Sequence, residues 1–310
     1  MKAMVSNAAV LGIFFVSQFG IGFIGNTLLL TLQTNILLFQ HRTKKPIDWI
    51  FIHLTLANVM TILFSGVPEI IHYFGIRNFL DDAGCKAVLY LFRVGRGLSL
   101  CTTSLLSMFQ AVIITPSNSR CAWLKPRIST CIFPAFLLFW ILNMLIYIRV
   151  IMNVVAPYNS TEVNQIYSLP YCISEGPCTK KISPFLGAMV TRDVLCLSLM
   201  ILTSMYMVRL LFTHRRTVQH IHRTSLCPRA SPETKATHTI LALVSCFVFF
   251  YWTDSCLTIY RNYRHNLHGL ENISLFLACS YPSICPFLLI KNNERGSFLN
   301  VHFRKSESSH

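Results

Sequence analysis

Five polar or charged side chains interrupt one long apolar stretch, residues 86–114, at regular intervals. They are Arg93, Arg96, Thr103, Ser107 and Gln110, at successive steps of 3, 7, 4 and 3 residues. Steps of three, four and seven place side chains on one face of an α-helix. The two arginines are fixed cations whose planar donors suit carboxylate or sulfate groups. The stripe therefore predicts a polar helix face where Arg93 and Arg96 bind an anionic group.

Carboxylates of the protein itself are the alternative partners of these arginines. Glu69, Asp193 and Asp254 each lie in a different apolar stretch. A charge taken out of water is normally paired, so internal ion pairs and ligand contact both agree with the sequence. Tyr251 and Trp252 come just before Asp254 and are candidate walls of a pocket. The residues predicted to form the ligand pocket are Arg93, Arg96, Glu69, Asp193, Tyr251 and Asp254.

The composition indicates which solvent surrounds these residues. Hydrophobic residues make up 53% of the 310-residue chain and charged residues 13%, about half the ~25% of soluble domains. The mean hydropathy is +0.51. A soluble fold cannot hide so much apolar surface, so lipid must surround most of the chain, and disorder is excluded. The net charge of +15 does not indicate a nucleic-acid partner, because the basic residues do not gather on a soluble module.

Seven apolar stretches are each long enough to cross the hydrocarbon core as a helix, which needs about 20 residues. Backbone groups in lipid must pair within their own segment, which selects helices, and the alternation typical of a transmembrane barrel is missing. The sequence predicts an all-α membrane protein, a single seven-helix bundle over residues 1–310 with a short tail at 291–310. The predicted spans are 8–38, 50–74, 86–114, 128–148, 184–212, 236–258 and 270–290.

Other residues inside the stretches predict how the helices meet. Asn26 and Asn58 lie at mid-depth in the first two spans and are expected to anchor neighbouring helices through hydrogen bonds. Prolines inside a helix remove a backbone donor and bend it. Kinks are predicted at Pro68, Pro134, Pro282 and Pro286.

The loops between the stretches differ in their content of Lys and Arg. If the N-terminus lies outside, the four inside segments hold 15 of these residues and the four outside segments hold 7. Positively charged loops stay on the cytoplasmic side. The sequence therefore predicts an N-terminus outside and a C-terminus in the cytoplasm, with most of the positive charge facing the anionic inner leaflet.

Most of the 12 cysteines lie inside spans, but Cys85, Cys172 and Cys178 are placed outside. Because an extracellular face is oxidising, a disulfide is expected there. Cys85–Cys172 is the preferred pair, Cys85–Cys178 is the second choice, and free thiols are the remaining possibility. The loop that holds the last two cysteines also contains Asn159-Ser160-Thr161, a glycosylation sequon consistent with the outside face.

No motif of an enzyme or a metal site is found. His214, His220 and His222 have a metal-like spacing, but no set of Cys or carboxylate residues accompanies them. Phosphate-binding glycine loops, zinc-protease pairs and nucleophile elbows are missing from the sequence. We therefore expect neither catalysis nor a cofactor. The short basic inside segments favour docking of a partner protein instead.

Two blocks of the sequence resemble one family closely. Residues 84–120 read GCKAVLYLFRVGRGLSLCTTSLLSMFQAVIITPSNSR, and residues 218–235 read VQHIHRTSLCPRASPETK. The RVGRG run, the FQA and PSNSR runs that end the third span, and the HIHRT and SPE runs of the later loop are similar to the vomeronasal type-1 (pheromone) receptors. These are G-protein-coupled receptors, and the resemblance covers nearly the whole chain.

The resemblance implies a function and a location. Receptors of this kind bind a small-molecule pheromone from outside, and the two arginines suggest an anionic one. They signal through a heterotrimeric G protein of the inhibitory class, in the plasma membrane of vomeronasal sensory neurons. The residues expected to face the G protein are Gln110, Arg120, Arg215, Arg216 and Arg223.

The sequence departs from common rhodopsin-like receptors at several positions. Phe109-Gln110-Ala111 replaces the usual acidic-Arg-aromatic triplet, Asn58 replaces the usual acid, and the sixth span has no internal proline. Contacts of Gln110 and of the basic 213–235 loop are expected to set the resting equilibrium instead. Bitter-taste receptors share the missing triplet and are the nearest alternative. A transporter or channel is the alternative from another class, but the sequence lacks the internal repeats typical of transporters.

Overall fold

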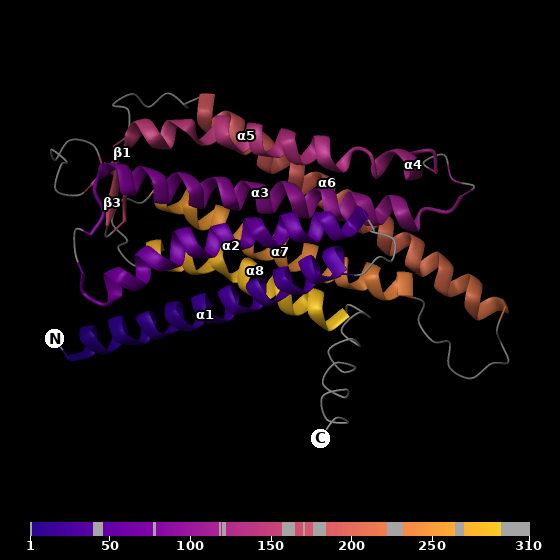
Figure 1. Cartoon of the computed structure of the whole chain (residues 1–310), viewed down its shortest axis with the longest axis horizontal. Helices are drawn as coiled ribbons and strands as arrows, with labels where there is room; N and C mark the ends of the chain where they lie inside the picture. The colour runs from indigo at the N-terminus through magenta and orange to yellow at the C-terminus, as the bar shows by residue number, and fades with distance from the viewer. Residues whose placement is uncertain are drawn as a thin grey trace, which may run out of the picture.

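The computed structural model describes residues 2–39, 46–76, 79–117, 119, 122–156, 165–169, 171–175, 184–221, 232–263 and 270–292. Within this part of the chain, seven helices are long and apolar enough to cross a membrane. They lie alongside one another in an elongated bundle (Figure 1), which confirms the predicted seven-helix architecture. The seven are α1 (Lys2–Phe39), α2 (Pro46–Tyr73), α3 (Asp82–Ile114), α5 (Ile132–Asn153), α6 (Pro184–Ile221), α7 (Pro232–Tyr263) and α8 (Leu270–Asn292).

Five of the seven spanning helices begin at a residue other than the predicted one: α1, α2, α3 and α7 begin four to six residues earlier, and α5 begins four residues later. Helix α3 begins at Asp82, four residues before the predicted span, because the Asp81 carboxylate accepts a hydrogen bond from the Gly84 amide (2.7 Å) and caps the first turn. The predicted fourth span, 128–148, is instead a short helix α4 (Leu124–Ile128) followed by α5. Pro134 therefore lies in the first turn of α5, where proline is well tolerated, and the predicted kink there was wrong.

Helix α3 is the central helix of the bundle. In its apolar window 83% of the residues are buried, against 11–50% in the other six spans. Thr103, Ser107 and Gln110 of the predicted polar stripe are all buried. The stripe thus faces the bundle and not the lipid, as predicted. Because α3 contacts α2, α5, α6 and α7, its side chains form much of the packing between the helices.

Polar side chains join the helices at mid-depth. Asn26 of α1 donates to the Pro282 carbonyl of α8 (2.8 Å), and Ser99 of α3 donates to the Asn58 side chain of α2 (2.8 Å). Both asparagines are therefore interhelical anchors, as predicted. Pro68, Pro282 and Pro286 all lie inside helices, Pro68 in α2 and the other two in α8.

A buried imidazole makes a third joint, which the sequence analysis did not predict. Trp140 Nε1 of α5 donates to His53 Nε2 of α2 (3.1 Å), and His53 Nδ1 lies 2.8 Å from Thr102 Oγ1 of α3. The His53 ring also stacks on Phe136, with the ring centroids 4.1 Å apart. Both ring nitrogens of His53 thus have partners, as buried polar groups normally do, and the side chain joins α2 to α3 and α5.

One end of the bundle carries a small antiparallel sheet that was not predicted. Its strands are β1 (Val154–Val155), β2 (Gln165–Leu169) and β3 (Cys172–Glu175), in the order β1-β3-β2. A disulfide joins Cys172, the first residue of β3, to Cys85 in the first turn of α3, which confirms the preferred pair. Cys178 and Asn159 lie outside the described residues. We call this end, where α1 also begins (Figure 1), the disulfide end.

Candidate functional site

Two arginine–aspartate ion pairs lie in the half of the bundle nearest the disulfide end. Arg96 of α3 pairs with Asp254 of α7 through its Nη2 atom. Arg192 of α6 pairs with its neighbour Asp193, with Arg192 Nη2 2.6 Å from Asp193 Oδ1. The predicted pairing of an arginine with Asp254 is therefore found. Asp193 instead forms its ion pair with Arg192, which was not among the predicted pocket residues.

Asp254 connects three helices through one carboxylate. Its Oδ2 atom faces Arg96, and its Oδ1 atom accepts a hydrogen bond from the Ser274 hydroxyl of α8. The Asp254 side chain is only 3% exposed, while that of Arg96 is 23% exposed. A buried carboxylate requires such partners to offset the loss of its hydration, so Asp254 fixes α7 against α3 and α8.

The Arg192 guanidinium donates hydrogen bonds to side chains of α5 and of its own helix, α6. Its Nη1 atom donates to Asn143 Oδ1 (2.5 Å) and its Nη2 atom donates to the Tyr147 hydroxyl (2.9 Å), both on α5. The guanidinium also lies over the Tyr147 ring, 5.3 Å from its centroid. Arg192 is therefore a structural cation that connects α6 with α5. The signal in the sequence was an Arg-Asp dipeptide inside an apolar stretch, where ionisable residues are rare and commonly pair with one another.

Tyr251 of α7 links the two ion pairs. Its ring lies under the Arg96 guanidinium, whose carbon is 4.8 Å from the ring centroid. Its hydroxyl donates to Asp193 Oδ2 at 2.5 Å. A cation over an aromatic face and a hydrogen bond to a carboxylate are both stabilising, and both are stronger when removed from water. The pairs on α3–α7 and on α6 thus form one continuous network.

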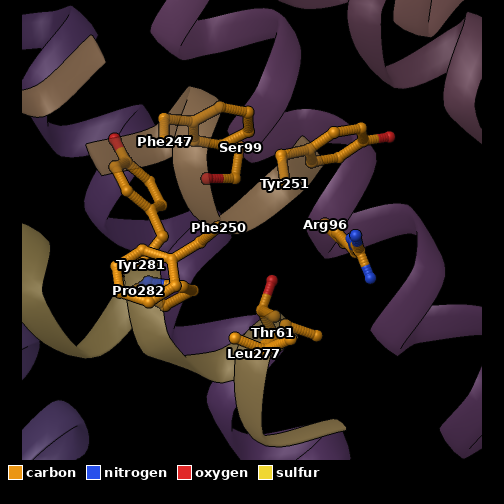
Figure 2. Close-up of a pocket in the computed structure, with 10 residues that line it drawn as sticks. Thr61, Arg96, Ser99, Phe247, Phe250, Tyr251, Leu277, Tyr281 and Pro282 are labelled. Atoms are coloured by element: carbon orange, nitrogen blue, oxygen red, sulfur yellow. The ribbon is translucent and has the colours of Figure 1, made fainter. Parts of the chain in front are cut away.

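A cavity opens beside this network. Arg96 and Tyr251 lie on one side of it, and Tyr281 and Pro282 of α8 lie on the other (Figure 2). It encloses about 310 Å³, a figure that includes its open mouth. The remaining lining residues are Thr61, Ser99, Phe247, Phe250, Leu277 and Ala278.

Aromatic rings that pack against one another form part of the wall of this cavity. Phe247 packs against Tyr251 (centroids 5.4 Å apart) and meets Tyr281 edge to face (4.5 Å). The Tyr281 hydroxyl lies 3.1 Å from Thr103 Oγ1 of α3. Apolar walls with a few fixed polar groups are typical of small-molecule sites. The lining therefore presents apolar ring faces together with the donors of Arg96.

Other predicted pocket residues lie elsewhere. Arg93 is half-buried, does not line this cavity, and forms no hydrogen bond or ion pair with a residue that the structure describes. Glu69 is buried in α2 and also lies outside the lining. Trp252 is 64% exposed and points away from the bundle, so it is not a wall of the pocket. Of the predicted set, the structure brings together Arg96, Tyr251, Asp254 and Asp193.

The opposite end of the bundle holds Gln110 and Arg216, two of the residues predicted to face a G protein. Gln110 is buried rather than exposed, and its Nε2 atom donates to Thr237 Oγ1 of α7 (3.2 Å). Arg216 is exposed near the end of α6. Arg120 and Arg223 lie outside the described residues, as does the side chain of Arg215. Gln110 therefore joins α3 to α7 in this conformation.

No group of three or more His, Cys, Asp or Glu side chains that could hold a metal ion occurs in the described parts of the chain. The site consists of paired charges, hydroxyl groups and aromatic rings. Such groups can bind and orient a small molecule. The seven spanning helices define a multi-pass membrane protein, and the cavity lies within its helix bundle.

Comparison with known proteins identifies the family. Residues 9–299 match the vomeronasal organ pheromone receptor family. The human protein named Vomeronasal type-1 receptor 3 is 36% identical over 294 residues, which is 94% of each chain. The human Vomeronasal type-1 receptor 4 is 41% identical over 246 residues, 78% of this chain and 81% of the other. In Danio rerio, Olfactory receptor class A-like protein 1 is 33% identical over 288 residues, 92% of this chain and 89% of the other.

The chain belongs to the vomeronasal type-1 receptor family, which are chemosensory G-protein-coupled receptors. Membership implies a small ligand, coupling to a G protein in general terms, and a multi-pass location in a membrane. It favours the receptor interpretation over the bitter-taste and transporter alternatives.

Proposed function

We propose that this receptor binds a small pheromone in the cavity between α2, α3, α7 and α8 and signals through a heterotrimeric G protein of the inhibitory class. The observation that carries the proposal is the cavity itself. Its walls are aromatic, and one guanidinium, that of Arg96, lines it while remaining 23% exposed. Its place in the disulfide half of the bundle gives a ligand access from one face of the membrane.

The disulfide end is the extracellular end in this proposal. Two observations support that orientation. The Cys85–Cys172 disulfide needs an oxidising environment. Because α1 begins at this end (Figure 1), the segments with the excess of Lys and Arg connect the helices at the opposite end. We further propose that the receptor lies in the plasma membrane of vomeronasal sensory neurons, and its membership of this family supports that location.

The ligand class follows from the charges around the cavity. Arg96 presents N–H donors in a planar fork that matches a carboxylate or a sulfate. Phe247, Phe250 and Tyr281 provide apolar ring faces for the rest of the molecule. We therefore propose a small anionic ligand with a compact apolar body. Arg93 lies one turn nearer the disulfide end and would attract the anion before it enters.

Binding changes signalling only if the ligand prefers the active arrangement to the resting one. The G protein is proposed to dock at the end opposite the cavity, where Gln110 ties α3 to α7. Opening that joint would separate α3 from α7 beside the end of α6, where Arg216 is already exposed. Arg120, Arg215 and Arg223 are the further residues proposed to face the G protein.

The test is nucleotide exchange on an inhibitory-class G protein in cells that express the receptor with an N-terminal tag. Carboxylate-bearing, sulfate-bearing and neutral small molecules are applied, and surface staining of the tag measures expression. We expect an anionic agonist whose potency falls in Arg96→Ala and, to a smaller extent, in Arg93→Ala. Arg149→Ala is the matched control, because Arg149 is an exposed arginine of α5 that does not line the cavity.

The outcomes separate the parts of this proposal. Unchanged agonist potency in both Arg93→Ala and Arg96→Ala would refute the anionic pocket. Exchange on a different G protein, with none on the inhibitory class, would refute the coupling assignment. Staining of the tag on unpermeabilised cells shows whether the disulfide end faces outward.

A further inference from the structure

The Arg96–Asp254 pair occupies the place that an anionic ligand would need. Arg96 lines the cavity and is 23% exposed, whereas Asp254 is 3% exposed and does not line it. A ligand in the cavity thus meets the cation first and finds the anion behind it. The resting receptor already holds one carboxylate on the guanidinium.

Adding a second anion to this pair is unfavourable. The charges of Arg96 and Asp254 cancel, so a ligand carboxylate beside Arg96 would experience repulsion from Asp254 as well as attraction. Like charges a few ångströms apart repel strongly where water is scarce. A ligand anion therefore binds well only when it takes the place of Asp254 on the guanidinium.

We propose that Asp254 is a specificity-determining residue, an internal carboxylate that the anionic group of the ligand displaces from Arg96. This inference rests on the proposed anionic ligand. The displaced Asp254 keeps the hydrogen bond from Ser274 but loses its cation. A buried carboxylate without a cation is costly, so α7 must shift to give it water. Binding of the anion and release of α7 from α3 are then one event.

The geometry of α7 carries that shift to the opposite end of the bundle. The helix has no proline after its first residue, Pro232, so it moves as one rigid body. Thr237, the partner of Gln110, lies 17 residues before Asp254, about 25 Å along the helix axis at the usual rise. Tyr251, one turn before Asp254, is attached to Asp193 of α6. A shift at Asp254 therefore acts on both α6 and the Gln110 joint.

The experiment compares Asp254→Asn, which keeps the shape and removes the charge, with Asp254→Glu, which keeps the charge. Trp252→Leu is the control, because Trp252 is exposed on the same helix. The probes are phenylacetate and phenylacetamide, which have nearly the same shape and differ in charge. Surface staining, nucleotide exchange without a probe and nucleotide exchange with each probe are measured for every variant.

A fluorescence-transfer pair, with one label in the 222–231 loop and one at the C-terminus, reports the receptor conformation whatever G protein is coupled. We expect Asp254→Asn to raise the basal signal about 5-fold or more, within the usual range of coupling between sites. Its phenylacetate response should gain about tenfold in potency, while any phenylacetamide response is unchanged. Asp254→Glu and Trp252→Leu should resemble the wild type.

Three results would overturn the inference at normal surface expression. The first is a basal signal in Asp254→Asn that equals or falls below that of the wild type. The second is a phenylacetate potency that is lower in Asp254→Asn than in the wild type. The third is a phenylacetate response that is missing from both receptors. A conformational signal without nucleotide exchange would instead refute the proposed G-protein coupling and leave the displacement standing.

Discussion

The guanidinium of Arg192 fills the space that a side chain at Gly97 would need. A Cβ atom added to Gly97 would lie 2.6 Å from Arg192 Nη1 and in still closer conflict with Asn143 Oδ1. The second glycine of the RVGRG run therefore allows α6 and α5 to bring their polar groups against α3. The RVGRG run therefore contributes to helix packing through Gly97, which has no side chain, as well as through its arginines.

We expect Gly97→Ala to destabilise the receptor, because the added methyl group must displace the Arg192–Asn143 hydrogen bond. Overpacking of a tight interior typically costs about 1–3 kcal/mol. Thermal unfolding of the tagged receptor in detergent measures the effect. Gly20→Ala is the matched control, because nothing lies within 4 Å of its added Cβ. Equal thermal stability of the two variants would show that Arg192 and Asn143 can move aside without a loss of stability.

Removal of one oxygen tests the link between the two ion pairs. Tyr251→Phe keeps the ring under Arg96 but loses the hydroxyl that donates to Asp193. A hydrogen bond to a charged group contributes about 1.5–3 kcal/mol, so we expect a loss of stability of that order. Tyr90→Phe is the control, because the Tyr90 hydroxyl donates to a neutral carbonyl, that of Met144. A larger loss in the control than in Tyr251→Phe would contradict the assignment.

The Cys85–Cys172 disulfide should contribute strongly to the stability of the folded receptor. Cys85 and Cys172 are 87 residues apart, and the chain-entropy model gives a loop of this length about 4–5 kcal/mol. We expect Cys172→Ser to reduce surface expression and thermal stability, and to make both insensitive to mild reductant. Cys131→Ser removes an exposed free thiol and should behave like the wild type. A Cys172→Ser receptor as stable as the wild type would refute this role.

The joint between Gln110 and Thr237 should hold the resting state. Gln110→Ala removes a neutral hydrogen bond of about 0.5–1.5 kcal/mol between α3 and α7. We expect basal nucleotide exchange to rise roughly 2- to 12-fold, since each 1.4 kcal/mol is about tenfold. Thr237→Val should raise it similarly, because it removes the acceptor. Constitutive signalling that stays unchanged in Gln110→Ala would count against the proposed role of this residue.

Several features followed from the sequence because they depend on local chemistry. A membrane span needs a certain length of apolar chain, so the seven helices could be counted before their packing was known. The polar stripe of α3 follows from the helix period alone. Asn26 and Asn58 were predicted as anchors because lipid offers no hydrogen-bond partner. A disulfide among Cys85, Cys172 and Cys178 was expected because these cysteines lie outside the spans, and the folded structure pairs Cys85 with Cys172.

The tertiary structure decided which charges meet. Arg96 had three candidate acids in three different spans, and only the packing of α7 against α3 selected Asp254. Asp193 went to Arg192, whose own partners on α5 lie some 45–49 residues away in sequence. Charges interact over a few ångströms where water is scarce, and the sequence alone does not state which helices are neighbours. For the same reason the buried position of Gln110 and the link through Tyr251 were visible only in the folded bundle.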